Sequence, residues 1–200
     1  MKIYFPLLLV MMLAGCADVP FLLPAQKANT DAWGLRQEAL YKLENWSIKG
    51  RLAIQAGDEG WSAALHWDQN DENYTMRFIA PLGQGTYQLH GDEQMVSFLN
   101  AKNELYQAND PEKLLLSNLG WSVPLHGLKY WIMGLPEPGI SSDNLLLDEL
   151  GRMTDLQQSG WRISISRYTD FHGTQLPSKL FMQNDRFKLR LVIQDWKTNS

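Results

Sequence analysis

Apolar and polar residues alternate along most of the chain from Trp46 onwards. In the first three runs the apolar positions of one face are Trp46, Ile48, Leu52, Ile54, Trp61, Ala63, Leu65, Trp67, Tyr74, Met76 and Phe78. A period of two predicts β-strands with one buried face. Short acidic connections at 56–60, 69–73 and 91–93 are typical of hairpin turns. Further strands are expected near 84–91, 94–100, 103–108, 144–148, 151–158, 160–168, 177–183 and 186–195.

Three segments show helical spacing instead. The first helix is expected from a cap at Asn29, Thr30 or Asp31 to about Leu43. The second begins at Asp110-Pro111, where the missing N–H of proline costs nothing, and ends at Gly120. The third begins at Pro124 and is ended by Gly134 and Pro136. The apolar faces of the first and third helices are expected to be formed by Leu35, Ala39, Leu40, Leu43, Leu125, Leu128, Trp131, Ile132 and Leu135.

An antiparallel sheet with one apolar face must close on itself or be covered. The pattern therefore predicts a curved sheet or open barrel, mostly β with α, whose helices lie over its apolar side. Large and adaptable Trp and Met residues recur on the apolar faces, which suits an irregular apolar pocket. The alternative is an ordinary core rich in aromatic residues, and composition alone favours that alternative.

The N-terminus reads as an export signal over residues 1–15. Lys2 precedes an apolar run that is too short to span a bilayer and that ends in small residues. The segment Leu13-Ala14-Gly15-Cys16 resembles the bacterial lipobox, whose cysteine is acylated and becomes the first residue of the mature chain. Cys16 is the only cysteine, so acylation explains a thiol that has no disulfide partner. Ala17, rather than an aspartate, follows it and favours the outer membrane under the enterobacterial sorting rule.

Residues 16–30 are interpreted as the acylated N-terminus and a tether, and residues 31–200 as one domain. The apolar cluster 21–23 in the tether could rest on the membrane or on the domain. The net charge of −4 argues against nucleic-acid binding and against electrostatic adhesion to anionic lipid. Attachment is therefore expected to come from the acyl chains, which anchor stably when there are two or more.

The turn Pro81-Leu82-Gly83 joins two predicted strands. Pro81 suits its second position and Gly83 its fourth, so Leu82 lies at the tip. A leucine that stays exposed does not contribute the roughly 1.5–3 kcal/mol of stabilisation that full burial of its side chain would provide. Either a neighbouring loop covers Leu82 or the side chain waits for an apolar partner, and the turn by itself favours the covered state.

An enzyme is a rival interpretation with little support in the sequence. The four histidines, His66, His90, His126 and His172, have no metal-ligand spacing, and a zinc site would lack a second cysteine. There is no Gly-x-Ser-x-Gly elbow, and no helix is expected directly after Gly83-x-Gly85. No catalytic residue, metal or cofactor is therefore predicted.

Three stretches together resemble the LolB family of outer-membrane lipoproteins. They are the lipobox, the Pro81-Leu82-Gly83 turn, and residues 124–136, which match a pattern of Pro-Leu, a spaced Leu, and Trp-Ile-x-Gly-Leu-Pro. The closing strand 189–196 is also similar, and departures are confined mainly to the tether and to 137–150. The resemblance covers essentially the whole mature chain. It implies an unclosed antiparallel β-barrel with a helical lid over an apolar cavity.

The resemblance also implies a function. Such a protein receives lipoproteins from the periplasmic carrier LolA, binds their acyl chains in the cavity and inserts them into the outer membrane. It would be a monomer on the periplasmic face, anchored by lipid on Cys16, with LolA, acylated cargo and outer-membrane lipid as partners. In the family the turn leucine protrudes and places cargo in the membrane, which matches Leu82 and reverses the preference for a covered state.

The cavity is expected between the alternating strand face and a lid formed by the 124–133 helix. Its expected lining is Trp46, Leu52, Trp61, Leu65, Trp67, Phe78, Leu128, Trp131 and Ile132. The alternative function is that of a structural envelope lipoprotein that binds another protein through an apolar face. That alternative predicts a filled interior and no uptake of lipid.

Overall fold

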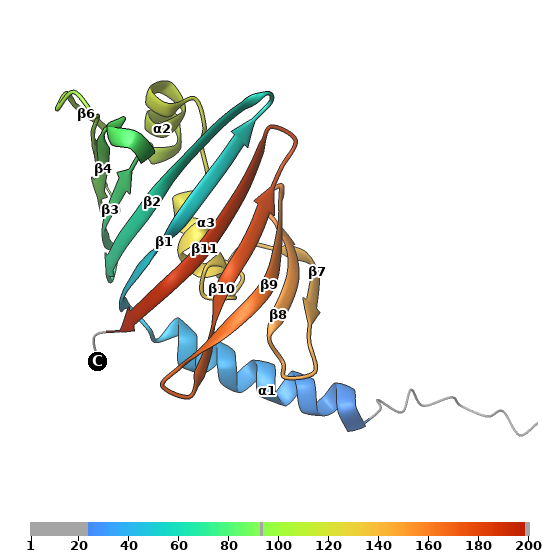
Figure 1. The fold of residues 1–200 in the computed structure, drawn as a ribbon. Helices are drawn as coiled ribbons and strands as arrows, with labels where there is room; N and C mark the ends of the chain where they lie inside the picture. Colours follow the sequence, from blue (N-terminus) through green and yellow to red (C-terminus); the bar gives the residue numbers. More distant parts are fainter. Residues whose placement is uncertain (1–23, 93, 199–200) are drawn as a thin grey trace, which may run out of the picture.

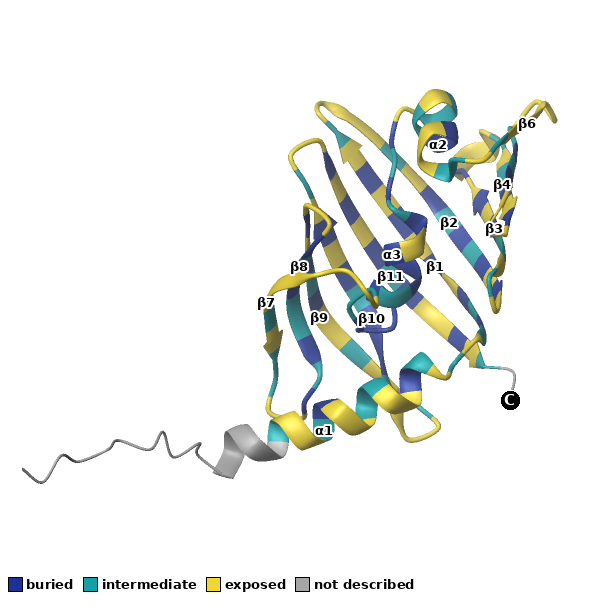
Figure 2. Cartoon of the chain, turned by 180° about the vertical axis from the view of Figure 1, so that it is seen from behind, coloured by how far each residue is buried: buried dark blue, intermediate teal, exposed yellow. Residues whose placement is uncertain are grey.

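The computed structural model describes residues 24–92 and 94–198, with side chains from Asn29 onwards. The predicted signal peptide, Cys16 and most of the predicted tether lie outside the described residues. The described chain forms one curved sheet that is covered by helices on a single face (Figures 1 and 2). None of its helices is long and apolar enough to cross a membrane.

The sheet has eleven strands in the order β6-β5-β4-β3-β2-β1-β11-β10-β9-β8-β7. Neighbouring strands are antiparallel throughout. The strands are β1 (Asn45–Ala56), β2 (Glu59–Asn70), β3 (Asn73–Ile79), β4 (Thr86–Gly91), β5 (Val96–Leu99), β6 (Leu105–Ala108), β7 (Ser142–Leu147), β8 (Met153–Gln158), β9 (Trp161–Phe171), β10 (Thr174–Gln183) and β11 (Phe187–Thr198). Since β6 and β7 remain unpaired edges, the barrel is not closed, and the prediction of an unclosed antiparallel sheet is confirmed.

The two halves of the chain meet where β1 pairs with β11 in the middle of the sheet. A β-bulge lies between Lys49 and Gly50, and a Cβ at position 50 would collide with the carbonyl oxygen of Val192. Only glycine allows this close approach of two strands. Because the alternation of buried and exposed residues persists on both sides of the bulge, the sheet keeps one apolar face (Figure 2).

Two short helices cover that apolar face (Figure 2). Helix α2 (Pro111–Leu119) has the predicted caps: the side chain of Asp110 accepts a hydrogen bond from the Lys113 amide, and Gly120 is left-handed. Helix α3 (Leu125–Trp131) begins as predicted but is shorter than expected. A tight turn follows it, in which the Gly134 amide donates to the Trp131 carbonyl over 3.0 Å.

Helix α1 (Pro24–Tyr41) lies along the lower end of the sheet in Figure 1 and begins earlier than predicted. The expected caps at residues 29–31 lie inside it, so the cap prediction is wrong. The predicted apolar face is also wrong in part, because Leu35 is 72% exposed and Ala39 is exposed. Trp33 and Leu40, seven residues apart, form the buried face instead.

Candidate functional site

The space between the sheet and α3 is a wholly apolar core with one small cavity. Strands β1, β2, β3, β10 and β11 form one wall, and the segment Trp121–Leu128 forms the other. The cavity is lined by Leu52, Leu65, Trp67, Met76, Phe78, Trp121, Val123, Leu125, Leu128, Met182, Leu189 and Leu191. These side chains offer an acyl chain apolar contacts on all sides.

The cavity has an open volume of only about 20 Å³. That is room for about one water molecule, whereas ligand sites in proteins typically enclose roughly 300–1,000 Å³. Side chains therefore fill almost all of the space between the sheet and α3 in this structure. Several lining side chains are able to yield, because Met76 and Met182 are flexible and Val123, Leu125 and Leu128 belong to α3 and its approach.

Five of the nine predicted cavity residues line this space: Leu52, Leu65, Trp67, Phe78 and Leu128. The other four lie in the surrounding core. Trp46 packs on Trp67 with ring centroids 5.0 Å apart, and Trp61 packs on Trp121 at 5.5 Å. Trp131 and Ile132 are fully buried at the end of α3.

The sequence did not identify two groups of lining residues. One group, Trp121 and Val123, precedes α3, and the other lies on the C-terminal strands β10 and β11. Met76, Leu189 and Leu191 were detectable, because each lies on the apolar side of a predicted alternating strand. Trp121 and Val123 lie in the connection between two helices, where no periodicity marks a buried side chain.

The C-terminal end of α3 is fastened to β8 by one buried amide. Gln158 is 2% exposed, and its Oε1 accepts from Trp131 Nε1 at 2.9 Å and from the Glu137 amide at 2.8 Å. Its Nε2 donates to the carbonyls of Glu137 and Ile140, both at 3.0 Å. The side chain thus satisfies all its hydrogen-bonding groups and fixes this end of the lid.

A second attachment of α3 is an ion pair with the β2–β3 turn. Lys129 is 8% exposed, and its Nζ lies 3.0 Å from Glu72 Oε1 and 2.9 Å from the Asp71 carbonyl oxygen. A surface hollow of about 260 Å³ adjoins this pair. Trp67, Met76 and Leu125 line both the hollow and the cavity, so the two spaces lie next to each other with these side chains between them.

One donor in the cavity wall has no partner. The indole Nε1 of Trp121 is buried and forms no hydrogen bond within the described residues, although the residue is only 3% exposed. An unpaired buried N–H costs about 1–3 kcal/mol.

The Leu82 turn presents its leucine to solvent. Pro81–Gly83 form the 3₁₀ turn η1, and Leu82 is 97% exposed with φ of 55°. The turn is held by hydrogen bonds from the Gln84 amide to the Pro81 carbonyl and from the Ala80 amide to the Gly85 carbonyl. Leu82 is therefore not covered by a neighbouring loop, and it occupies a left-handed conformation that disfavours residues with a Cβ.

The histidines do not form a common site. His126 lies 2.6 Å from Glu137, and His90 lies 3.0 Å from Thr75, both at the surface. Over the part of the chain that the structure describes, no group of three or more His, Cys, Asp or Glu residues is arranged to hold a metal ion.

An unclosed antiparallel sheet with helices over an apolar interior defines the LolA-like class of folds. A LolA superfamily protein from Nitrosomonas europaea has this shape, with a TM-score of 0.57 over 90% of this chain and 95% of that one at 10% identity. A DUF1329 family protein from Desulfovibrio piger gives 0.57 over 86% and 92% at 8% identity. At these identities the likeness shows the fold alone.

Sequence relatives give the family. The model of the family described as "Outer membrane lipoprotein LolB" matches residues 44–196. The outer-membrane lipoprotein LolB of Nitrosococcus oceani is 38% identical over 96% of this chain and 94% of its own length, and that of Stutzerimonas stutzeri 34% over 94% and 92%. The chain belongs to the LolB family. It is an outer-membrane lipoprotein involved in lipoprotein localisation, and it is not an enzyme.

Proposed function

We propose that the chain receives lipoproteins from the carrier LolA by accepting their acyl chains between the sheet and α3, and that it then inserts them into the outer membrane. The observation that carries this proposal is the wholly apolar cavity beneath α3, lined by both the strand face and the helix. Each buried methylene is worth about 0.8 kcal/mol, so acyl chains do not leave one protein for water at a useful rate. Transfer therefore runs from interior to interior within a complex with the carrier.

Entry of an acyl chain requires the closed lid to open. The hydrogen bonds of Gln158 hold the C-terminal end of α3 and the loop after it to β8. Among the described residues, the segment Trp121–Leu128 has no side-chain hydrogen bond to the sheet. Its His126 contacts Glu137 in the loop after α3, and its cavity-facing side chains are apolar. We infer that this segment moves away from the sheet, while the end near Gln158 acts as the fixed point.

The hollow beside Lys129 is the expected mouth. It adjoins the cavity through Trp67, Met76 and Leu125, and its outer part carries Lys129 and His126. An acylated cargo can therefore place its chains inside while its polar peptide stays at the surface. Within the interior, the unpaired N–H of Trp121 could donate a hydrogen bond to an acyl carbonyl oxygen.

Delivery is assigned to the Leu82 turn. Its exposed leucine projects from a hydrogen-bonded turn and has no packing role to lose. The sequence contains no phosphate-binding loop, so nucleotide hydrolysis does not supply the direction of transfer. A tenfold preference at each step requires only about 1.4 kcal/mol.

The proposal is tested by the transfer of acylated cargo from LolA to variants of the interior. Leu65→Glu places a charge in the strand wall, and Leu128→Gln places a milder polar group in the lid. Lys188→Glu changes an exposed side chain on β11 and serves as the control. Both interior variants should take up less cargo than the control, provided that circular dichroism shows them folded. Equal uptake by folded interior variants would place the acyl chains elsewhere.

The structural lipoprotein remains a second candidate because of one observation. The interior is almost filled, as a protein that only binds a partner through an apolar face would require. The two candidates differ in the wild-type chain, since only a receptor takes up acylated cargo. Failure of the wild type to accept cargo or any fatty acid would favour the structural role.

A further inference from the structure

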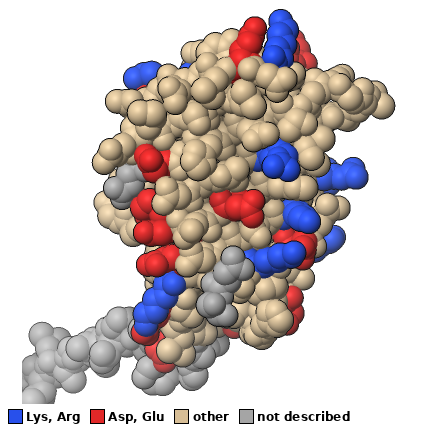
Figure 3. Space-filling model, turned by 90° about the vertical axis from the view of Figure 1, so that its left-hand side faces the viewer, with Lys and Arg blue, Asp and Glu red and all other residues tan. Residues whose placement is uncertain are grey.

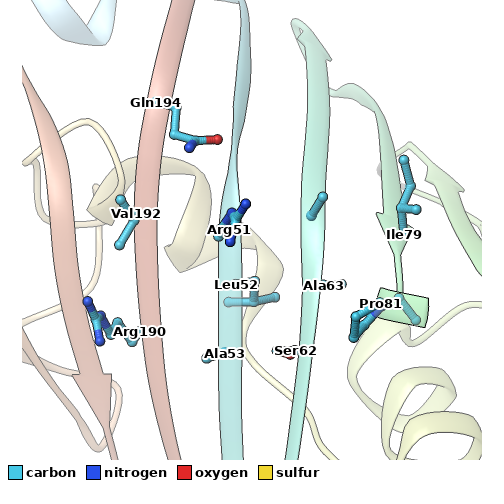
Figure 4. Close-up of a pocket in the computed structure, with 12 residues that line it drawn as sticks. Arg51, Leu52, Ala53, Ser62, Ala63, Ile79, Pro81, Arg190, Val192 and Gln194 are labelled. Carbon is cyan, nitrogen blue, oxygen red and sulfur yellow. The ribbon is translucent and has the colours of Figure 1, made fainter. Parts of the chain in front are cut away.

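The outer face of the sheet, opposite the helices, carries a groove of about 720 Å³ (Figure 4). It is far larger than the closed interior cavity. Small side chains form its floor, two arginines line it, and one of its walls is the start of the Leu82 turn. The residues that define it are Arg51, Ala53, Ser62, Ala64, Pro81 and Arg190.

The register of three central strands creates this shape. Ala53 of β1 lies opposite Ser62 of β2 on one side and opposite Arg190 of β11 on the other. Arg51 lies two residues from Ala53 on the same face, opposite Ala64. Alanine and serine therefore leave a hollow between strands, and the two guanidinium groups come from adjacent strands at diagonal positions.

Neither arginine is engaged by an acidic residue. Within 24–92 and 94–198, Arg51 and Arg190 form no ion pair and no side-chain hydrogen bond, and Arg190 only approaches the Phe181 ring, at 5.9 Å. Exposed Lys49 and Lys188 lie on the same two strands. In Figure 3, Lys and Arg gather mainly toward the right of the view and Asp and Glu mainly toward the left. Around the groove the outer sheet face is thus basic, although the exposed Asp195 lies opposite Lys49 on β11.

The groove is continuous with the exposed apolar tip. Ile79 and Pro81 belong to its wall, and the next residue is Leu82. Apolar side chains of segments that lie in a membrane interface are buried about 5–10 Å into the boundary between head groups and acyl chains. A basic groove directly beside such a side chain would then face the head groups themselves.

We propose that this groove binds the phosphate of an anionic lipid head group. Guanidinium groups suit this ligand, because their planar donors match phosphate oxygens in a bidentate manner. An acidic protein surface would also be attracted to arginines, but the neighbouring exposed leucine favours a lipid surface. The placement of the groove at the membrane rests on the proposed delivery role of Leu82, whereas head-group binding itself does not require cargo.

The test measures flotation of the full mature chain, with Cys16→Ala to remove the acyl anchor, on phosphatidylcholine vesicles with and without phosphatidylglycerol. Each basic residue near an anionic surface contributes about a fivefold gain in partitioning, so Arg51→Gln together with Arg190→Gln should lower the phosphatidylglycerol-dependent gain about 25-fold. Lys42→Gln with Arg167→Gln removes the same charge from the turn after α1 and from β9 and is the matched control.

A third variant distinguishes specific binding in the groove from nonspecific electrostatic attraction of the arginines to an anionic vesicle. Ser62→Phe fills the floor and keeps both arginines, so it should also weaken the preference for phosphatidylglycerol. If the control lowers partitioning as much as the arginine variant, or if Ser62→Phe has no effect, there is no head-group site. If none of the variants changes binding, the basic face serves another partner, such as an acidic protein. Leu82→Asn should lower binding to both vesicle types alike, so failure of the insertion loop is distinguishable from failure of the groove.

Discussion

Replacing Leu82 by asparagine should make the protein slightly more stable and less able to deliver cargo. Leu82 has φ of 55° and is 97% exposed, so it contributes strain and almost no burial to the fold. A left-handed conformation costs a residue with a Cβ about 1–2 kcal/mol, and asparagine tolerates it better. We therefore expect Leu82→Asn to raise the free energy of unfolding by up to about 1 kcal/mol.

The opposite change is expected at the membrane. Full burial of a leucine side chain is worth about 1.5–3 kcal/mol, and all of it is available because the folded protein buries almost none. If the tip is buried during delivery, Leu82→Asn should slow incorporation of preloaded lipoprotein into liposomes by about 10- to 100-fold. Loading from the carrier should be unchanged.

The assay pairs chemical denaturation with liposome incorporation, and Leu150→Asn is the control because Leu150 is another exposed leucine, in the β7–β8 turn. A marked loss of stability in Leu82→Asn would show that the side chain packs against the domain. Delivery equal to that of the control would remove the loop from the mechanism.

Four further variants test helices α2 and α3 and their supports. Gln158→Leu leaves Trp131 Nε1 and the polar groups of Glu137 and Ile140 without partners, so denaturation should show a loss of at least about 3 kcal/mol; a loss below 1 kcal/mol would contradict the fastening role. Trp131→Phe should cost more than Trp121→Phe by about 1 kcal/mol, because only Trp131 donates a hydrogen bond; the reverse order would mean that Trp121 has a partner. Hydrogen bonds from the Lys113 amide and side chain lower the pKa of Asp110. Asp110→Ala should thus cost about 1 kcal/mol at neutral pH, and this difference should vanish as the pH falls through the lowered pKa; a difference that persists in acid would exclude the carboxylate.

Much of the fold was predictable because local rules and tertiary packing agree. Strict alternation in β1, β2 and β11 identifies the apolar face of the sheet, and the caps Asp110 and Gly120 define α2. Helix α1 was harder. Its buried face is formed by Trp33 and Leu40. Between them, Arg36 donates a hydrogen bond to the Gln175 carbonyl on β10, and no local sequence pattern reveals this contact with a distant strand.

The candidate sites divide in the same way. Turn chemistry placed Leu82 at the tip of its turn, but its exposure and role were expected only from the family resemblance. Leu65, Trp67 and Phe78 were identified from alternation. The closure of the cavity was not predictable, because its volume depends on how side chains from five strands and the lid interdigitate. The outer groove was missed for a different reason: a net charge of −4 conceals a local basic face that exists only when β1 and β11 are paired.

The most direct measurement of the proposed receptor mechanism is photo-crosslinking with an acylated cargo that carries a photoreactive group near the end of one acyl chain. After transfer from the carrier, mass spectrometry identifies the labelled residues. Acyl chains held beneath α3 should label the cavity wall, with Met76, Trp121, Leu128 and Met182 among the labelled residues. Labelling confined to the outer face of the sheet, or none above a non-acylated control, would contradict an acyl-binding interior.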